Sequence, residues 1–508
     1  MTMTGSNAIA RIPTGINGFD HVTLGGLPAG RSTLVSGTTG SGKTLFAVEF
    51  LSRGIMRFNE PGVFVTFEET ITDIRRNSAS LGFPIQLWED EGKWAFVEAS
   101  ASIGEDAPAV GAYDFGALVA RIEHAVRQTG ARRVALDSLN AIFTRFADIS
   151  VVRHELFRVA SALKALGVTS VLTAERPEEY DGVTRYGVEP FVLDNVIILR
   201  NVLRQGRRSR TVEIVKFRGA THRTGEWLFT IDPRDGIVVV PLAFLTPSDH
   251  ASLARVSSGI PELDEMCGGG FYRDAIVVMT GPTGTGKTLA SLRFAASAVE
   301  AGERCLLCTF DGTRGQLFRT AASWGLDLKA MQASGLVRVM SGYAEVTSPE
   351  DHFLQLRRAI EEFAPARLVI DTLSALERVV APRTLLGFII ALGAVLRQSE
   401  ITTLLTRTPT GRLTSADAPV ITSDIAGLAD VWIQLRYVEG PAEIQRAIAV
   451  LQARGSAHDH RVRQFRIDGT GMHIGEPLRG VPHVFTGAIS PGIAWGWPGS
   501  EVTEGPSG

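Results

Sequence analysis

Short apolar segments alternate with longer stretches of helical periodicity along both halves of the chain. Apolar runs that predict buried strands in the first half lie at residues 31–37, 62–68, 132–139 and 168–175. Residues 44–56 and 152–166 carry apolar side chains at the spacing of an amphipathic helix. After Arg200, residues 211–219 and 225–231 predict antiparallel additions to the sheet. The alternation predicts an α/β fold in which helices flank a mainly parallel sheet.

The same order of motifs occurs twice, separated by about 240 residues. The recurring pairs are Gly15 and Gly259, Asp20 and Asp264, Gly37 and Gly281, Asp137 and Asp371, Asp194 and Asp430, and Arg218 and Arg454. Chance does not keep such an order over a whole repeat. We therefore expect two tandem domains, residues 1–245 and 246–475, followed by a Gly- and Pro-rich tail, residues 476–508.

Each half contains a GxxxxGK[ST] motif between a predicted strand and a predicted helix. The motif residues are Gly37, Thr38, Thr39, Gly40, Ser41, Gly42, Lys43 and Thr44 in the first half, and Gly281, Pro282, Thr283, Gly284, Thr285, Gly286, Lys287 and Thr288 in the second. The glycines let backbone N–H groups surround phosphate oxygens, and the helix start adds positive potential. The lysine reaches the β- and γ-phosphates. Both halves are therefore expected to bind ATP with Mg²⁺.

An aspartate ends a buried strand in each half, Asp137 after "RRVAL" and Asp371 after "ARLVI". The carboxyl end of a parallel strand faces the ligand crevice, where a carboxylate can hold Mg²⁺ together with the P-loop threonines Thr44 and Thr288. A single aspartate at a strand end is more often a cap or turn residue. Its recurrence beside both P-loops favours the magnesium site.

Hydrolysis needs a group that orients or deprotonates the attacking water. Glu68 and Glu69 end the strand "GVFVTFEE" and are candidates for this role, although acidic residues are also common at solvated helix starts. The matching positions in the second half are Asp311 and Gly312. The shorter aspartate withdraws its carboxylate by about 1.5 Å, and glycine offers none. Misplacement of that order costs about 10²-fold in rate, so we expect unequal hydrolysis in the two halves.

Two cations lie near the end of each half. Lys216 and Arg218 stand two apart on a predicted strand and share one face, and their counterparts are Gln452 and Arg454. In ring ATPases such cations come from the neighbouring subunit and stabilise charge on the γ-phosphate. The residues by themselves favour an ordinary solvated strand.

Segments beyond the P-loops resemble the KaiC family of circadian clock ATPases between about Arg11 and Gly475. They are "VSSGIPELDEMCGGGF", "RYGVEPFVLDNVIILRNVL" and "VKFRGATH". The resemblance implies two RecA-like domains and an ATP-dependent homohexamer shaped as a double ring, with nucleotides between subunits. It implies that Glu68 and Glu69 are the hydrolytic pair of the first ring, with Lys216 and Arg218 acting in trans. Arg454 is then expected at the nucleotide of the second ring.

The second half departs from the family pattern. KaiC proteins use the second ring as an autokinase and autophosphatase with adjacent Ser and Thr acceptors in the neighbouring subunit. Here these positions align with Ala426 and Gly427, which have no hydroxyl. Together with Asp311, Gly312 and Gln452, this predicts hydrolysis mainly in the first domain and weak or no autokinase activity in the second.

Two alternatives stay open. Thr422 and Ser423 lie close to the aligned acceptor positions and would serve a clock Ser/Thr autokinase and autophosphatase with shifted sites. The chain would otherwise be a nucleotide-gated scaffold whose partner binding is timed by hydrolysis. The tail lacks the amphipathic helix that recruits KaiA. A KaiB-like partner on the first ring stays open, because that half follows the family pattern more closely.

Composition narrows the class of function further. The 51 basic and 54 acidic residues give a formal charge of −3, which argues against nucleic-acid binding and DNA translocation. No apolar run is long enough to span a membrane, and the absence of a secretory segment together with few cysteines fits a cytoplasmic protein. Cys305 and Cys308 form a CxxC, but three residues apart on a strand they point to opposite faces and are expected in the core.

Overall fold

The computed structural model describes residues 9–99, 115–140, 148–180, 182–184, 187, 189–204, 207–240, 252–380, 382–409, 427–439 and 443–478. The chain forms two compact units, Met1–Phe244 and Leu245–Gly508. The last strand continues to Pro477, past the expected start of the tail at residue 476. The rest of that tail, residues 479–508, lies outside the described residues, as do Thr422, Ser423 and Ala426.

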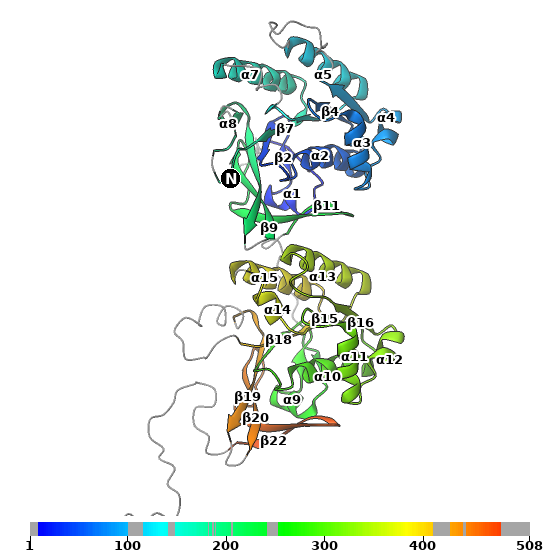
Figure 1. Cartoon of the computed structure of the whole chain (residues 1–508), viewed down its shortest axis with the longest axis vertical. Coiled ribbons are helices and arrows are strands. Elements are labelled where there is room, and N and C mark those ends of the chain that lie inside the picture. The colour runs from blue at the N-terminus through cyan, green and yellow to red at the C-terminus, as the bar shows by residue number, and fades with distance from the viewer. Residues whose placement is uncertain are drawn as a thin grey trace, which may run out of the picture. The chain divides into compact units, whose positions relative to one another are not determined.

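The first unit is built on a nine-stranded sheet (Figure 1). Its strands are β3 (Ser32–Gly37), β4 (Gly62–Thr66), β5 (Trp94–Glu98), β6 (Arg133–Asp137), β7 (Thr169–Glu175), β8 (Asn195–Arg204), β9 (Arg207–Phe217), β10 (Glu226–Asp232) and β11 (Gly236–Val239). They lie in the order β11-β10-β9-β8-β3-β7-β6-β4-β5. The strands from β8 to β5 are parallel, and β9, β10 and β11 pair antiparallel. The predicted parallel sheet with antiparallel additions is confirmed.

Helices cover both faces of this sheet. They are α1 (Phe19–Val22), α2 (Lys43–Phe58), α3 (Ile71–Ala79), α4 (Ile85–Asp90), α5 (Phe115–Thr129), α7 (Ile149–Ala165) and α8 (Glu189–Val192), beside a small ribbon of β1 (Arg11–Ile12) and β2 (Leu27–Pro28). Neighbouring residues of β3 belong to hydrophobic cores on opposite faces of the sheet. Val35 packs in the core that contains Phe50 of α2, and Leu34 packs in the core that contains Ile122 of α5 and Leu156 of α7. This period of two explains why strands buried on both faces are continuously apolar.

The second unit repeats this architecture. Its strands are β12 (Arg255–Val256), β13 (Phe271–Tyr272), β14 (Ile276–Thr280), β15 (Cys305–Thr309), β16 (Val337–Ser341), β17 (Arg367–Ile370), β18 (Thr402–Arg407), β19 (Val431–Glu439), β20 (Ile444–Ala453), β21 (Arg463–Asp468) and β22 (Gly471–Pro477). Its helices are α9 (Pro261–Met266), α10 (Lys287–Glu300), α11 (Arg314–Ser323), α12 (Leu328–Ala333), α13 (Pro349–Phe363), α14 (Ser374–Glu377) and α15 (Pro382–Gln398). The main sheet has the order β16-β15-β17-β18-β14-β19-β20-β21-β22. Read from β22, this is the strand order of the first sheet. The predicted fold of two tandem RecA-like domains is confirmed.

The cysteines of the second unit belong to its interior, as expected. Cys305 joins one apolar core, while the sulfur of Cys308 lies 3.9 Å from that of Met340. Burial raises the pKa of the Cys305 thiol to about 12, so it stays protonated at neutral pH. No group of three metal-ligating side chains occurs among the described residues. The CxxC is therefore part of the core.

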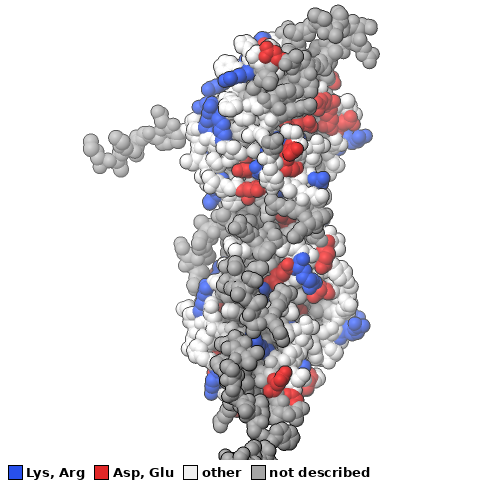
Figure 2. Space-filling view, turned by 60° about the vertical axis from the view of Figure 1, so that its left-hand side comes forward, with Lys and Arg blue, Asp and Glu red and all other residues white. Residues whose placement is uncertain are grey.

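None of the helices in the described part of the chain is long and apolar enough to cross a membrane. Figure 2 shows basic and acidic side chains together on the visible face of each unit, with uncharged surface among them.

A buried carboxylate joins the P-loop helix of the first unit to the sheet edge. Glu49 of α2 is fully buried, and its Oε1 accepts the backbone N–H of Ile237 at 2.5 Å. Arg53 Nε lies 3.4 Å from the other carboxylate oxygen. Burial outweighs these contacts and raises the pKa of Glu49 to about 7. The corresponding position of the second unit is Arg293, whose Nη2 donates to the Thr470 carbonyl at 2.5 Å.

Replacing Glu49 with Gln should make the first unit less sensitive to pH. The folded state holds the Glu49 proton more tightly than the unfolded chain, whose pKa is near 4.5. Stability is therefore lost as pH rises from about 4.5 to 7, by on the order of 3 kcal/mol. We expect Glu49→Gln to gain stability relative to the wild type between pH 5 and pH 8 in urea unfolding. Glu361→Gln on the exposed face of α13 is the matched control, and equal pH profiles for both variants would contradict the assignment.

Candidate functional site

The first P-loop connects the end of β3 to the start of α2. Gly42 precedes the helix with φ of 99°, a left-handed conformation that favours glycine. A Cβ on Gly37 would lie 2.3 Å from the Ser41 hydroxyl. That hydroxyl is buried and has no hydrogen-bond partner among the described residues. The narrow loop, with its unpaired polar atom at a helix start, fits a bound phosphate group.

Lys43 and Thr44 point to the same site. Lys43 Nζ donates to the Thr38 carbonyl at 2.9 Å. Burial lowers the pKa of Lys43. Nearby carboxylates oppose that shift, and the largest opposing effect comes from Glu175, followed by Asp137, Glu179 and Glu68. The lysine is thus a partly buried cation with acidic neighbours, close enough to the loop to turn from a carbonyl to a phosphate oxygen.

The two expected metal ligands of the first unit are in contact. Thr44 Oγ1 donates to Asp137 Oδ2 at 2.8 Å, and Thr173 donates to the other oxygen of the same carboxylate. Burial raises the pKa of Asp137, and both hydroxyls counteract it. A hydroxyl and a carboxylate oxygen side by side are hard oxygen donors, which fit Mg²⁺.

The second unit repeats this pair. Thr406 donates to Asp371 Oδ1, and Thr288 forms a hydrogen bond with the same carboxylate. Burial again raises the pKa of Asp371. Lys287 Nζ donates to the carbonyls of Gly281 and Pro282 at 2.7 and 2.8 Å. The residues that the sequence predicts to hold nucleotide are therefore arranged alike in both units.

Glu68 and Glu69 follow β4, next to the end of the Asp137 strand. Register pairs Thr66 with Asp137, which brings both glutamates to the carboxyl edge of the sheet. Desolvation raises the pKa of Glu68, and the charges of Glu175 and Asp137 raise it further. Glu69 lines a cavity of about 240 Å³ together with Thr44. Both glutamates therefore lie at the same edge of the sheet as Asp137.

The glutamates differ in their contacts. Glu69 Oε1 accepts from Asn77 Nδ2 at 2.7 Å, whereas no hydrogen bond to the Glu68 carboxylate is found among the described residues. Desolvation also raises the pKa of Glu69. A carboxylate with raised proton affinity and free lone pairs suits a general base. Glu68 meets this description better than Glu69.

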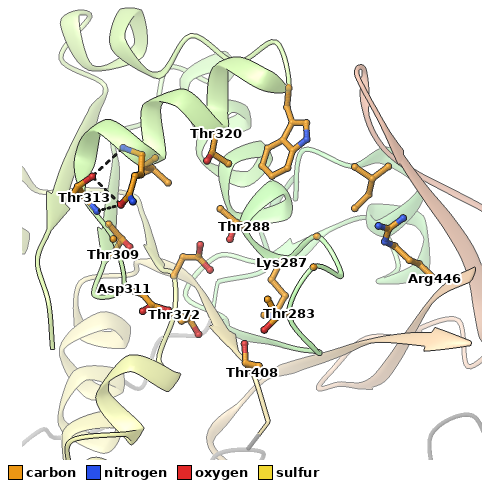
Figure 3. A pocket seen from close by; sticks show the side chains of 18 residues that line it. Thr283, Lys287, Thr288, Thr309, Asp311, Thr313, Thr320, Thr372, Thr408 and Arg446 are labelled. Carbon is orange, nitrogen blue, oxygen red and sulfur yellow. Dashed lines mark hydrogen bonds between the residues drawn. The ribbon is translucent and has the colours of Figure 1, made fainter. Parts of the chain in front are cut away.

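The second unit has a cavity of about 540 Å³ around its P-loop. Figure 3 shows Lys287 and Thr288 in the middle of this cavity, with Asp311 and Arg446 on opposite sides. Asp311 Oδ1 accepts from Arg378 Nη2 at 3.0 Å, so its carboxylate is already paired. This cavity has room for a nucleotide but lacks a second carboxylate at Gly312.

The N-terminal caps of the following helices confirm the alignment of the two units. Thr70 caps α3 and Thr313 caps α11, each accepting the backbone N–H three residues on. Glu68 and Asp311 both stand two residues before these caps. Asp311, with its shorter side chain, therefore occupies the position after β15 that Glu68 occupies after β4.

Lys216 and Arg218 lie away from the P-loop of their own unit. Register pairs Lys216 with Val196 and Asn195 with Thr33, near the beginning of β3, whereas the P-loop follows its end. Lys216 Nζ donates to the carbonyls of Pro190 and Leu193 at 2.6 and 2.7 Å. Desolvation lowers the pKa of Lys216, and the Arg218 charge adds to the effect.

The second unit has the same arrangement. Gln452 pairs with Trp432, which in turn pairs with Val278 in the middle of β14, whereas the P-loop follows the end of that strand. Gln452 Nε2 donates to the Ala429 carbonyl at 2.8 Å, and Arg454 Nη2 donates to the Gly427 carbonyl at 2.5 Å. These side chains do not join the P-loop site of their own unit.

Sequence reasoning missed the contribution of β7. Thr173 binds Asp137, and Glu175 pairs in register with Gly37 of the P-loop. The repeat offered a signal for the threonine, since Thr406 occupies its place in "LLTRT". Thr408 stands where Glu175 does, so a further carboxylate is missing from the second site.

Both halves of the chain match one known protein family. The family model described as "ATPase: KaiC" matches residues 12–243 and, a second time, residues 256–479. The chain belongs to the KaiC family. The two matches fall one on each unit, so each P-loop lies in a domain of the KaiC type.

Similarity to individual KaiC proteins extends over nearly the whole chain. Circadian clock protein KaiC3 of Synechocystis sp. is 49% identical over 482 residues, which cover 95% of each chain. The circadian clock oscillator protein KaiC of Synechococcus elongatus is 46% identical over 481 residues, covering 95% of this chain and 92% of its own. That of Prochlorococcus marinus is 44% identical over 481 residues, covering 94% and 95%. The chain is a KaiC-family P-loop ATPase of the circadian clock type.

Proposed function

We propose that this KaiC-family protein hydrolyses ATP mainly in its first domain, residues 1–245. The second domain, residues 246–475, would bind nucleotide with weak or no autokinase activity. The observation that carries the proposal is the difference at the ends of β4 and β15. Glu68 has no hydrogen-bonded partner among the described residues, whereas Asp311 is bound to Arg378 and Gly312 has no carboxylate.

The residues of the first site would divide the work. ATP with Mg²⁺ supplies the γ-phosphoryl group that is transferred to water. Lys43 would leave the Thr38 carbonyl for the phosphates, and Thr44 with Asp137 would hold the metal. Glu68 would accept the proton of the attacking water, because its raised pKa favours the protonated form.

We further propose that the site is completed by a second copy of the chain in a homohexameric ring. Lys216, on β9, and Arg218, which directly follows β9, lie beside the start of β8, away from their own P-loop. In a ring they would reach the γ-phosphate of the neighbouring subunit, where a cation stabilises developing charge. Arg454 would take the same place in the second ring. A KaiB-like protein is the partner that we propose for the first ring, on the strength of its KaiC-type residues.

Incubation of the protein with γ-³²P-ATP tests the division of labour between the domains. We expect released phosphate and no stable label on the protein. Asp311→Asn should leave the release rate within about twofold of the wild type, because Asp311 is tied to Arg378 and contributes little to catalysis. Label that stays on the protein and disappears in Asp311→Asn would show that the second domain is a working kinase, with acceptors such as Thr422 or Ser423.

A further inference from the structure

The first P-loop is attached to a carboxylate that no motif includes. Thr38 Oγ1 donates to Glu179 Oε1 at 2.5 Å. The other carboxylate oxygen accepts the backbone N–H of Asn201 at 3.1 Å, and Asn201 Nδ2 donates to the Gly40 carbonyl at 3.3 Å. Glu179, on the chain between β7 and α8, thereby joins the P-loop to β8.

Glu179 is itself firmly attached. Its backbone carbonyl accepts from Arg200 Nε at 3.2 Å, and Arg200 Nη2 forms an ion pair with Glu213 at 2.6 Å on β9. Arg200 also lies over the Tyr180 ring, 5.4 Å from its centre. The carboxylate that holds Thr38 is therefore anchored to two strands of the sheet.

Thr38 is bound from both sides. Its carbonyl accepts from Lys43, and its hydroxyl donates to Glu179. When Lys43 turns from this carbonyl to a phosphate oxygen, one of the two restraints on the loop is removed. The hydrogen bond to Glu179 remains and keeps the loop in place. No binding free energy is then lost in ordering the loop around the nucleotide.

The second unit restrains the same position by covalent means. Pro282 stands where Thr38 does, and its ring fixes φ but offers no hydroxyl. Tyr437, the counterpart of Asn201, donates from its hydroxyl to the Thr283 carbonyl at 3.3 Å. The second P-loop cannot form the hydrogen bond that Thr38 makes in the first, and it has the rigid residue Pro282 at that position instead.

We propose that Glu179 is a positioning residue for nucleotide binding in the first unit, holding the P-loop through Thr38 as the proline ring of Pro282 does in the second. The inference rests on the proposed function of the first P-loop as an ATP site. Glu179 acts through the loop and not on the phosphates, because a carboxylate would repel them.

The test is the dissociation constant of a fluorescent, non-hydrolysable ATP analogue. The full-length chain carries Lys287→Ala in every sample, which weakens the second site. Glu179→Ala and Thr38→Val should each raise the dissociation constant of the first site about tenfold, the loss of roughly 1.4 kcal/mol. Glu178→Ala, which removes the neighbouring exposed carboxylate, is the matched control and should stay within about twofold.

Two combinations separate positioning from a general loss of structure. Thr38→Val with Glu179→Ala should bind no more weakly than Glu179→Ala alone, because the replacement of Glu179 already removes the hydrogen bond to Thr38. Thr38→Pro with Glu179→Ala should regain most of the affinity, since proline restores the restraint. Unchanged affinity in Glu179→Ala, additive losses, or no recovery with proline would each overturn the inference. No binding by the Lys287→Ala parent would instead overturn the proposed function.

Discussion

Replacing Glu68 and Glu69 together by Gln is expected to reduce phosphate release by 10²-fold or more, about the contribution of a positioned general base. The amides cannot accept a proton from water. Because they are neutral, they also lack the negative charge that would orient the attacking water. Nucleotide affinity should change only severalfold, because Lys43, Thr44 and Asp137 keep their contacts. Released phosphate and the dissociation constant for ATP are measured on the same preparations.

A second glutamate pair provides the control for this variant. Glu361 and Glu362 are adjacent on α13, and both side chains are more than half exposed. Their double replacement by Gln makes the same change in net charge away from either P-loop. Turnover should then remain close to that of the wild type. A Glu68→Gln/Glu69→Gln variant that still hydrolyses ATP at the normal rate would exclude both residues from catalysis.

Arg133→Ala is expected to destabilise the first unit by about 3–5 kcal/mol, the range for removing one partner of a buried ion pair. The guanidinium lies at the start of β6, fully buried, and forms an ion pair with Glu60 at 2.6 Å. It also donates to the carbonyls of Pro13 and Phe50 at 2.8 and 3.0 Å. Its central carbon lies 4.9 Å from the centre of the Phe50 ring. Deleting it leaves a cavity and buried carbonyls without donors.

The second unit offers an independent repeat of this experiment. Arg367 begins β17, pairs with Glu303 at 2.7 Å and donates to the Ser257 carbonyl at 2.8 Å. Urea unfolding and hydrogen exchange should show each replacement loosening mainly its own unit. Arg357→Ala breaks only an exposed ion pair on α13 and should cost less than about 1 kcal/mol. A loss below about 1 kcal/mol in Arg133→Ala would contradict a structural role for the buried cation.

The two units show how a duplicated site can diverge while its fold is kept. Both preserve the lysine, threonine and aspartate that hold nucleotide, together with a threonine that binds the aspartate. The differences fall on carboxylates at strand ends, where Glu68 and Glu175 correspond to Asp311 and Thr408. Strand-end side chains contribute little to the core, so they can change without cost to folding. On the proposed function, we therefore expect nucleotide binding and hydrolysis to be separable in this chain.

The sequence by itself determined the duplicated α/β fold, and it predicted the residues that would hold nucleotide. Strand and helix periods report local burial, and the P-loop needs its glycines, lysine and threonine within one short segment. The second unit could then be aligned with the first residue by residue. This alignment identified Asp311 and Gly312 as the places where the second unit departs from the first.

Only the tertiary structure decided how distant segments complete these sites. The sheet places β7 beside both β3 and β6, which brings Glu175 and Thr173 to the P-loop and to Asp137. The hold of Glu179 on Thr38 and the pairing of Asp311 with Arg378 likewise join residues far apart in the chain. No local pattern encodes such contacts, because strand order and side-chain direction arise only when the sheet assembles and its helices pack.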